Sequence, residues 1–138
     1  MSKVTSQQEL NVPAEEVWAL IGKFNALADW HPAVETSTLS DDGTIRTLSL
    51  AGGGEIVERL EKLNDGDYEY SYSILDSPLP VSDYTSTLKI RRNDDGKGCV
   101  VEWGSDFKPA GVSAADAEKV INGIYQAGFD NLRKIFGV

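Results

Sequence analysis

Cysteine and histidine are scarce in this sequence, which contains only Cys99 and His31 among 138 residues. One cysteine cannot form an internal disulfide, and a chain without disulfides is typical of a reducing compartment such as the cytoplasm. The sequence also has no cysteine pair, no His-x-x-x-His spacing and no carboxylate cluster at ligand spacing. We therefore predict no zinc or iron site, no other metal and no cofactor.

Basic residues and long apolar runs are also few. Lys and Arg number 13 against 22 Asp and Glu, which gives a net charge of −9. This sign opposes binding to phosphate backbones and to anionic lipid. No apolar run approaches the ~20 residues that span a bilayer, and the first residues resemble no signal peptide. We expect no nucleic-acid partner, no membrane insertion and a cytoplasmic location, while the oligomeric state is left open.

The composition is that of an ordinary globular protein, with 41% hydrophobic and 25% charged residues. A chain of this length buries roughly two-thirds of the surface that its unfolded form exposes. We therefore predict a single domain over residues 1–138.

The middle of the chain shows the alternation of strands. From Val34 to Phe107 the apolar residues recur with a period of two, and turn-forming residues break the pattern five times. Six strands are predicted there, and the β-capable residues 3–11 bring the sheet to about seven. The connections are too short for crossover helices, so the sheet should be antiparallel. The breaks are Asp41-Asp42-Gly43, Gly52-Gly53-Gly54, Asn64-Asp65-Gly66, Ser77-Pro78-Leu79-Pro80 and Asn93-Asp94-Asp95-Gly96.

Helical patterns lie on both sides of these strands. Pro13 suits the first position of a short helix, and residues 25–32 should form a helical turn that leads into a loop. A helix of about six turns should run from an N-cap at Ser113 to Phe136. Two apolar stripes support these helices: Val17, Leu20, Ile21 and Phe24 in the first, and Ala117, Val120, Ile121, Ile124, Tyr125, Gly128, Phe129, Leu132 and Phe136 in the last.

This order of elements predicts an α+β fold in which the concave face of the sheet covers the long C-terminal helix. The segment Val-Pro-Ala-Glu-Glu-Val-Trp-Ala-Leu-Ile at 12–21, the triplet Trp30-His31-Pro32, the aromatic-rich strands and the terminal helix resemble the polyketide cyclase/dehydrase and lipid-transport (SRPBCC) superfamily. That superfamily includes START domains and the pollen-allergen fold. The resemblance implies a helix-grip fold. It does not imply one activity, because the superfamily contains carriers, receptors, cyclases and chaperone activators.

The most informative pattern surrounds the three glycines at 52–54. If Leu48 and Ile56 both face the core, paired residue numbers must have an even sum, which also places Arg46 and Glu58 on the core face. Buried charges need partners. Arg46 and Glu58 are therefore either a structural ion pair or the groups that orient the polar end of a ligand in a cavity.

Aromatic residues fall on the same predicted face. Several Tyr hydroxyls and a Trp N–H would make this interior more polar than an ordinary core, which favours a ligand cavity. The predicted ligand-binding residues are Trp30, His31, Arg46, Glu58, Tyr70, Tyr72, Tyr84, Trp103, Tyr125 and Phe129. A pocket bounded by Trp30, Tyr72, Tyr84, Trp103, Tyr125 and Phe129 is expected.

Three functions are compatible with these residues. The first is binding of a small hydrophobic or aromatic molecule by a carrier or sensor. The second, implied by the resemblance to cyclases, is an enzyme in which Glu58 or His31 moves a proton and Arg46 or a Tyr hydroxyl stabilises an oxygen anion. In that case Glu58, Arg46 and His31 are the catalytic candidates, although His31 could equally be a turn residue that caps backbone groups. The third is a protein-interaction module with an exposed apolar patch.

Overall fold

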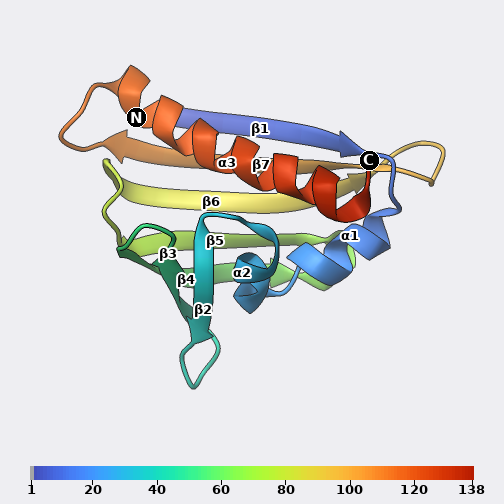
Figure 1. Cartoon of the computed structure of the whole chain (residues 1–138), viewed down its shortest axis with the longest axis horizontal. Helices are drawn as coiled ribbons and strands as arrows, with labels where there is room; N and C mark the ends of the chain where they lie inside the picture. Colours follow the sequence, from blue (N-terminus) through green and yellow to red (C-terminus); the bar gives the residue numbers. More distant parts are fainter. Residues whose placement is uncertain (1) are drawn as a thin grey trace.

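A computed structural model describes residues 2–138, and in it seven strands form one antiparallel sheet in the order β1-β7-β6-β5-β4-β3-β2. The prediction of six strands after residue 33 and one before residue 12 is confirmed. The first and last strands of the chain, β1 and β7, are antiparallel neighbours in the sheet, whereas the two termini lie at opposite ends of the molecule (Figure 1). The strands are β1 (Ser2–Leu10), β2 (Val34–Leu39), β3 (Ile45–Leu50), β4 (Glu55–Asn64), β5 (Glu69–Asp76), β6 (Val81–Arg92) and β7 (Cys99–Pro109).

The turn between β3 and β4 sets the register of the site. Gly52, Gly53 and Gly54 have φ angles of 89°, 102° and 101°. Residues that carry a Cβ atom rarely adopt positive φ angles of this size, so the turn requires glycine at these positions. The turn pairs Leu48 with Ile56 and Arg46 with Glu58. The predicted even-sum register is thus confirmed.

Short helices follow β1, as predicted. They are α1 (Ala14–Ile21), the 3₁₀ turn η1 (Phe24–Ala26) and α2 (Leu27–Trp30), and a second 3₁₀ turn, η2 (Asp65–Asp67), precedes β5. The prediction that Pro13 is the first helical residue is wrong by one position, because Pro13 has an extended ψ of 142° and is the N-cap of α1. Phe24 lies beyond the end of α1 but is buried, so it still contributes to the core.

The long helix α3 (Ala114–Phe136) lies across the sheet and over β1, β7 and β6 (Figure 1). Its predicted N-cap is confirmed, since the Ser113 hydroxyl accepts a hydrogen bond from the Asp116 N–H at 3.1 Å. Its buried residues face the sheet, and they are Ala117, Ile121, Tyr125, Gly128, Phe129 and Leu132.

Val120 does not belong to this buried face as predicted, because it is 40% exposed. Consecutive helical residues are about 100° apart, so Val120 lies at the margin of the stripe beside Ile121. The sheet does not cover that margin.

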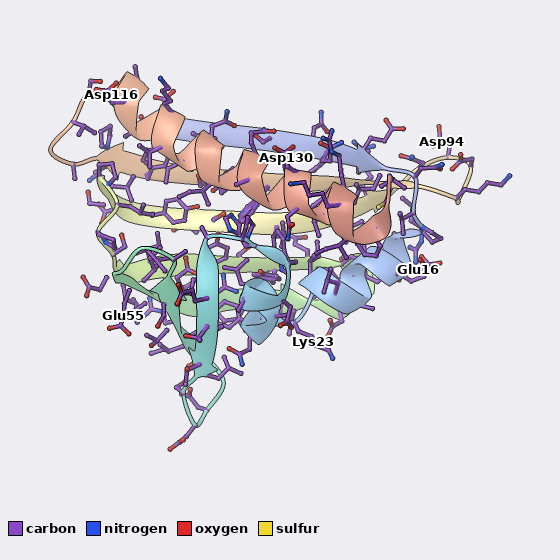
Figure 2. All side chains as sticks on the ribbon, viewed as in Figure 1. Glu16, Lys23, Glu55, Asp94, Asp116 and Asp130 are labelled. Carbon is purple, nitrogen blue, oxygen red and sulfur yellow. The ribbon has the colours of Figure 1, made fainter. Side chains whose placement is uncertain are left out.

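The core therefore lies between the sheet on one side and α3 with the short helices α1 and α2 on the other. Charged side chains such as Glu16, Lys23, Glu55, Asp94, Asp116 and Asp130 are exposed and lie at the periphery (Figure 2). Within residues 2–138, the helices are all too short or too polar to cross a membrane.

Candidate functional site

Arg46 and Glu58 form an ion pair inside the protein. Their side chains are 0% and 6% exposed. Arg46 Nε donates to Glu58 Oε1 at 2.8 Å, and Arg46 Nη2 lies 2.7 Å from the same oxygen. The paired positions of β3 and β4 bring the two charges together, so each neutralises the other inside the protein.

Arg46 has further partners that fix its position. Its Nη1 donates to the backbone carbonyl of Phe24 and lies 3.5 Å from the Tyr70 hydroxyl. The guanidinium carbon lies 4.1 Å from the centre of the Phe24 ring and 4.9 Å from that of Tyr72, distances at which cations and aromatic faces attract. The guanidinium thus links β3 to the turn before α2 and is rigidly held.

The surroundings of the pair change the acidity of both groups. Burial raises the pKa of Glu58 above its ordinary value, although the charge and hydrogen bond of Arg46 act against this. Burial alone would lower the pKa of Arg46, but its interactions with Tyr70, Glu58 and Tyr72 outweigh that effect and raise it. Arg46 therefore remains a cation.

A small apolar pocket adjoins this pair. It has a volume of about 200 Å³ and lies between α3, the core face of β3 to β7 and the loop after α2. Ala33 and Ala51 are exposed and mark its mouth, while Leu48 and Trp103 are buried at its wall. The pocket is lined by Leu27, His31, Ala33, Val34, Leu48, Leu50, Ala51, Ile56, Glu58, Tyr72, Ile74, Leu79, Tyr84, Trp103 and Ile124.

Half of the predicted ligand-binding residues line this pocket. These are His31, Glu58, Tyr72, Tyr84 and Trp103. The other five are buried but lie outside the lining, and they are Trp30, Arg46, Tyr70, Tyr125 and Phe129. The Tyr125 ring, for example, packs against a lining residue, because it stacks on Trp103 with 4.4 Å between the ring centres.

The polar atoms of the aromatic wall are largely engaged with one another. Trp103 Nε1 donates to the Tyr72 hydroxyl at 3.0 Å, and the Tyr84 hydroxyl is hydrogen-bonded to that of Tyr125. Ser86 joins this second pair, with its hydroxyl 3.2 Å from that of Tyr125. Burial raises the pKa of Tyr72 and Tyr84 well above its ordinary value, so both are neutral phenols.

His31 lies at the mouth side of the pocket, where both ring nitrogens are occupied by backbone groups. Nδ1 accepts from the Ala33 N–H at 3.1 Å, and Nε2 lies 2.7 Å from the Ile124 carbonyl. Because Nδ1 accepts a hydrogen bond, Nε2 must carry the proton and donate a hydrogen bond to the Ile124 carbonyl. Burial lowers the pKa of His31, and the bond to Ile124 partly offsets this. His31 thus matches the predicted alternative of a turn residue that caps backbone groups, and its second hydrogen bond also attaches it to α3.

Several lining residues were not predicted as site residues. Leu48, Ile56 and Ile124 had been placed on the core face by periodicity, but periodicity does not distinguish a packed residue from one beside a cavity. Ala33, Ala51 and Leu79 lie in connections, which have no period at all. The only sequence signal for Ala33 is its position two residues after His31.

Cys99 lies outside the lining of the pocket. Cys99 is buried in β7, and burial raises the pKa of its thiol to about 11, so it is an unreactive core residue. Among residues 2–138 there is also no group of three or more His, Cys, Asp or Glu side chains that could hold a metal ion.

Comparisons with known proteins identify the family of the chain and relatives with the same fold. Residues 1–137 match a family described as polyketide cyclase/dehydrase and lipid transport. None of the curated proteins matches the chain.

Two solved structures resemble this chain over nearly their whole length. One is the protein XoxI from Bacillus cereus, with 38% identity, a TM-score of 0.96 and coverage of 99% of this chain and 96% of that one. An uncharacterised protein from Bacillus thuringiensis has 37% identity and a TM-score of 0.96, with 99% of this chain and 100% of that one covered.

A START superfamily protein from Mycobacterium smegmatis has the same fold, with a TM-score of 0.79 over 97% of this chain and 96% of that one, but only 12% identity. The fold is therefore START-like and of the helix-grip type, as predicted. Since the family match spans nearly every residue, the chain belongs to the polyketide cyclase/dehydrase and lipid transport family.

Proposed function

We propose that this protein binds a small, largely apolar molecule in the pocket beside Glu58 and acts as a carrier or sensor. The observation that carries the proposal is the wall of the pocket, in which aliphatic and aromatic side chains surround one buried carboxylate. Binding sites for small molecules have this composition, with apolar walls and a few polar groups that orient the ligand. The family to which the chain belongs is consistent with a hydrophobic ligand.

An enzyme of the cyclase or dehydrase type has less support from the geometry. His31 uses both ring nitrogens for backbone groups, and Arg46 does not line the pocket. Only Glu58 and the two tyrosines then remain beside a bound molecule for proton transfer. A protein-interaction module has less support as well, because the exposed large apolar residues are spread over β2, β4, β5, the connection before α3, α3 itself and the chain end.

We also propose a cellular location and a domain organisation for this protein. Its single cysteine, buried and unpaired, is compatible with work in a reducing compartment, so we place it in the cytoplasm. We further propose that residues 1–138 act as one domain, since the sheet and α3 share one core.

Native mass spectrometry tests the binding function. Protein purified without denaturation should carry an additional small mass. The substitution Ala33→Trp places a large ring at the mouth of the pocket and should remove that mass. Ala19→Trp is the control, because Ala19 is an exposed residue of α1 outside the pocket. A bound mass that persists in Ala33→Trp would contradict the proposed site.

A further inference from the structure

The volume of the pocket limits the size of its ligand. About 200 Å³ is below the range of roughly 300–1,000 Å³ that is usual for sites of drug-sized ligands. It is slightly larger than an apolar cavity of about 150 Å³ that binds benzene in another protein. The pocket therefore matches one substituted ring, with no room for a long acyl chain or a fused polycyclic compound.

The carboxylate of Glu58 supplies an unused acceptor at this pocket. Oε1 receives the hydrogen bond from Arg46, whereas Oε2 has no hydrogen-bond partner among residues 2–138. The pocket borders Glu58 but not Arg46, so the carboxylate is the charged group that a ligand meets. The Glu58 side chain is only 6% exposed, so a ligand donor that reaches Oε2 makes a hydrogen bond to a charged acceptor that is largely shielded from bulk water.

The charge balance selects a neutral ligand. Arg46 and Glu58 cancel each other, so an added cation would be left without a countercharge in an apolar cavity, at a high desolvation cost. An anion would meet the Glu58 carboxylate directly and would also approach a protein of net charge −9. A neutral O–H or N–H group can donate to Oε2 without either cost.

The walls favour a flat ring. Tyr72, Tyr84 and Trp103 line the pocket, and their polar atoms are hydrogen-bonded to one another or to Tyr125. Aromatic rings prefer offset or edge-to-face contacts with other rings. We propose that the ligand is a neutral single-ring aromatic compound whose O–H or N–H group donates to Glu58 Oε2. This inference rests on the proposed binding function.

Matched probes test the inference with the full-length protein. Phenol and toluene have the same shape, but only phenol carries a donor. Phenol should bind about tenfold more tightly than toluene in calorimetric titrations, since a hydrogen bond to a charged acceptor contributes at least that much. Benzyl alcohol should likewise bind more tightly than protonated benzylamine. Equal or stronger binding of toluene, or of benzylamine, would overturn the inference.

Two variants separate this inference from the binding function itself. Glu58→Leu combined with Arg46→Met removes the acceptor without leaving an unpaired charge, so the preference for phenol should disappear while toluene still binds. Ala33→Trp should abolish binding of both probes. If wild-type protein bound neither probe but still carried a co-purified mass, this inference would be wrong and the binding function would stand. If Ala33→Trp bound both probes as wild type does, the proposed pocket itself would be wrong. A preference for phenol that survives in the double variant would show that Glu58 is not the acceptor.

Discussion

At the scale of single residues, the ion pair between Arg46 and Glu58 is the most consequential feature. Glu58→Gln removes one charge and leaves the guanidinium uncompensated at a site with 0% exposure. We expect the free energy of unfolding to fall by about 3–5 kcal/mol, as measured by chemical denaturation. The double change Arg46→Met and Glu58→Leu should be less harmful than the single one, although the Phe24 carbonyl then loses its donor.

Glu61→Gln provides the matched control, because Glu61 lies on the same strand and pairs with Arg59 at 3.0 Å on the exposed surface. Exposed pairs are screened by water, so this change should leave the unfolding midpoint almost unchanged. Similar losses in Glu58→Gln and Glu61→Gln would contradict the view that burial makes the first pair important.

The pH dependence of stability depends on His31, whose pKa is lowered in the folded protein from its ordinary value of 6.5. Below pH 6.5 the unfolded chain takes up a proton more readily than the folded one, so stability falls as pH decreases until it passes the folded pKa. Protonation also removes the lone pair with which Nδ1 accepts from Ala33. Melting temperatures between pH 7.5 and 5 should therefore decrease more steeply for wild type than for His31→Gln. Parallel curves would show that His31 does not titrate on unfolding.

At the scale of elements, α3 packs tightly against the rings of Trp30, His31 and Trp103 at Gly128. A Cβ atom at this position would lie 3.0 Å from His31 Cδ2, 3.0 Å from Trp30 Cζ3 and 3.1 Å from Trp103 Cζ3. Gly128→Ala should destabilise the protein by about 1–3 kcal/mol, because three packed rings would have to move. Thermal or chemical unfolding measures this loss.

Gly123 gives the comparison within the same helix. A Cβ atom there meets nothing within 4 Å, so Gly123→Ala should show only the helix preference for alanine and stabilise by roughly 0.5–1 kcal/mol. If both substitutions stabilised the protein, the close contact of α3 with the ring cluster would be disproved.

At the scale of the whole molecule, the sheet and α3 depend on each other. The core lies on one side of the sheet, and α3 covers the part of it that β1, β7 and β6 form (Figure 1). A chain that ends at Val112 should show no cooperative unfolding transition, because both Trp103 and Phe107 would be exposed to water. A chain that ends at Phe136 is the control and should unfold cooperatively. Calorimetry of the two truncated chains distinguishes these outcomes.

The sequence by itself determined the elements and their faces. The period of two between Val34 and Phe107, interrupted by turn residues, predicted six strands, and the shared core face of Leu48 and Ile56 predicted that Arg46 would oppose Glu58. The Ser113 cap and the apolar stripe of α3 were equally clear. These features are local, since side-chain direction follows directly from strand and helix geometry.

Only the tertiary structure decided which core-facing residues border empty space. Trp30 and Phe129 have the same apolar character as Trp103, but they pack solidly behind the wall that Trp103 forms. Cavities arise where side chains from distant elements fail to fill the space between them, and no period in a sequence encodes that sum of volumes. The same holds for His31, because its tether to the Ile124 carbonyl joins residues 93 positions apart. The position of α3 decides whether the His31 ring has a hydrogen-bond partner for Nε2.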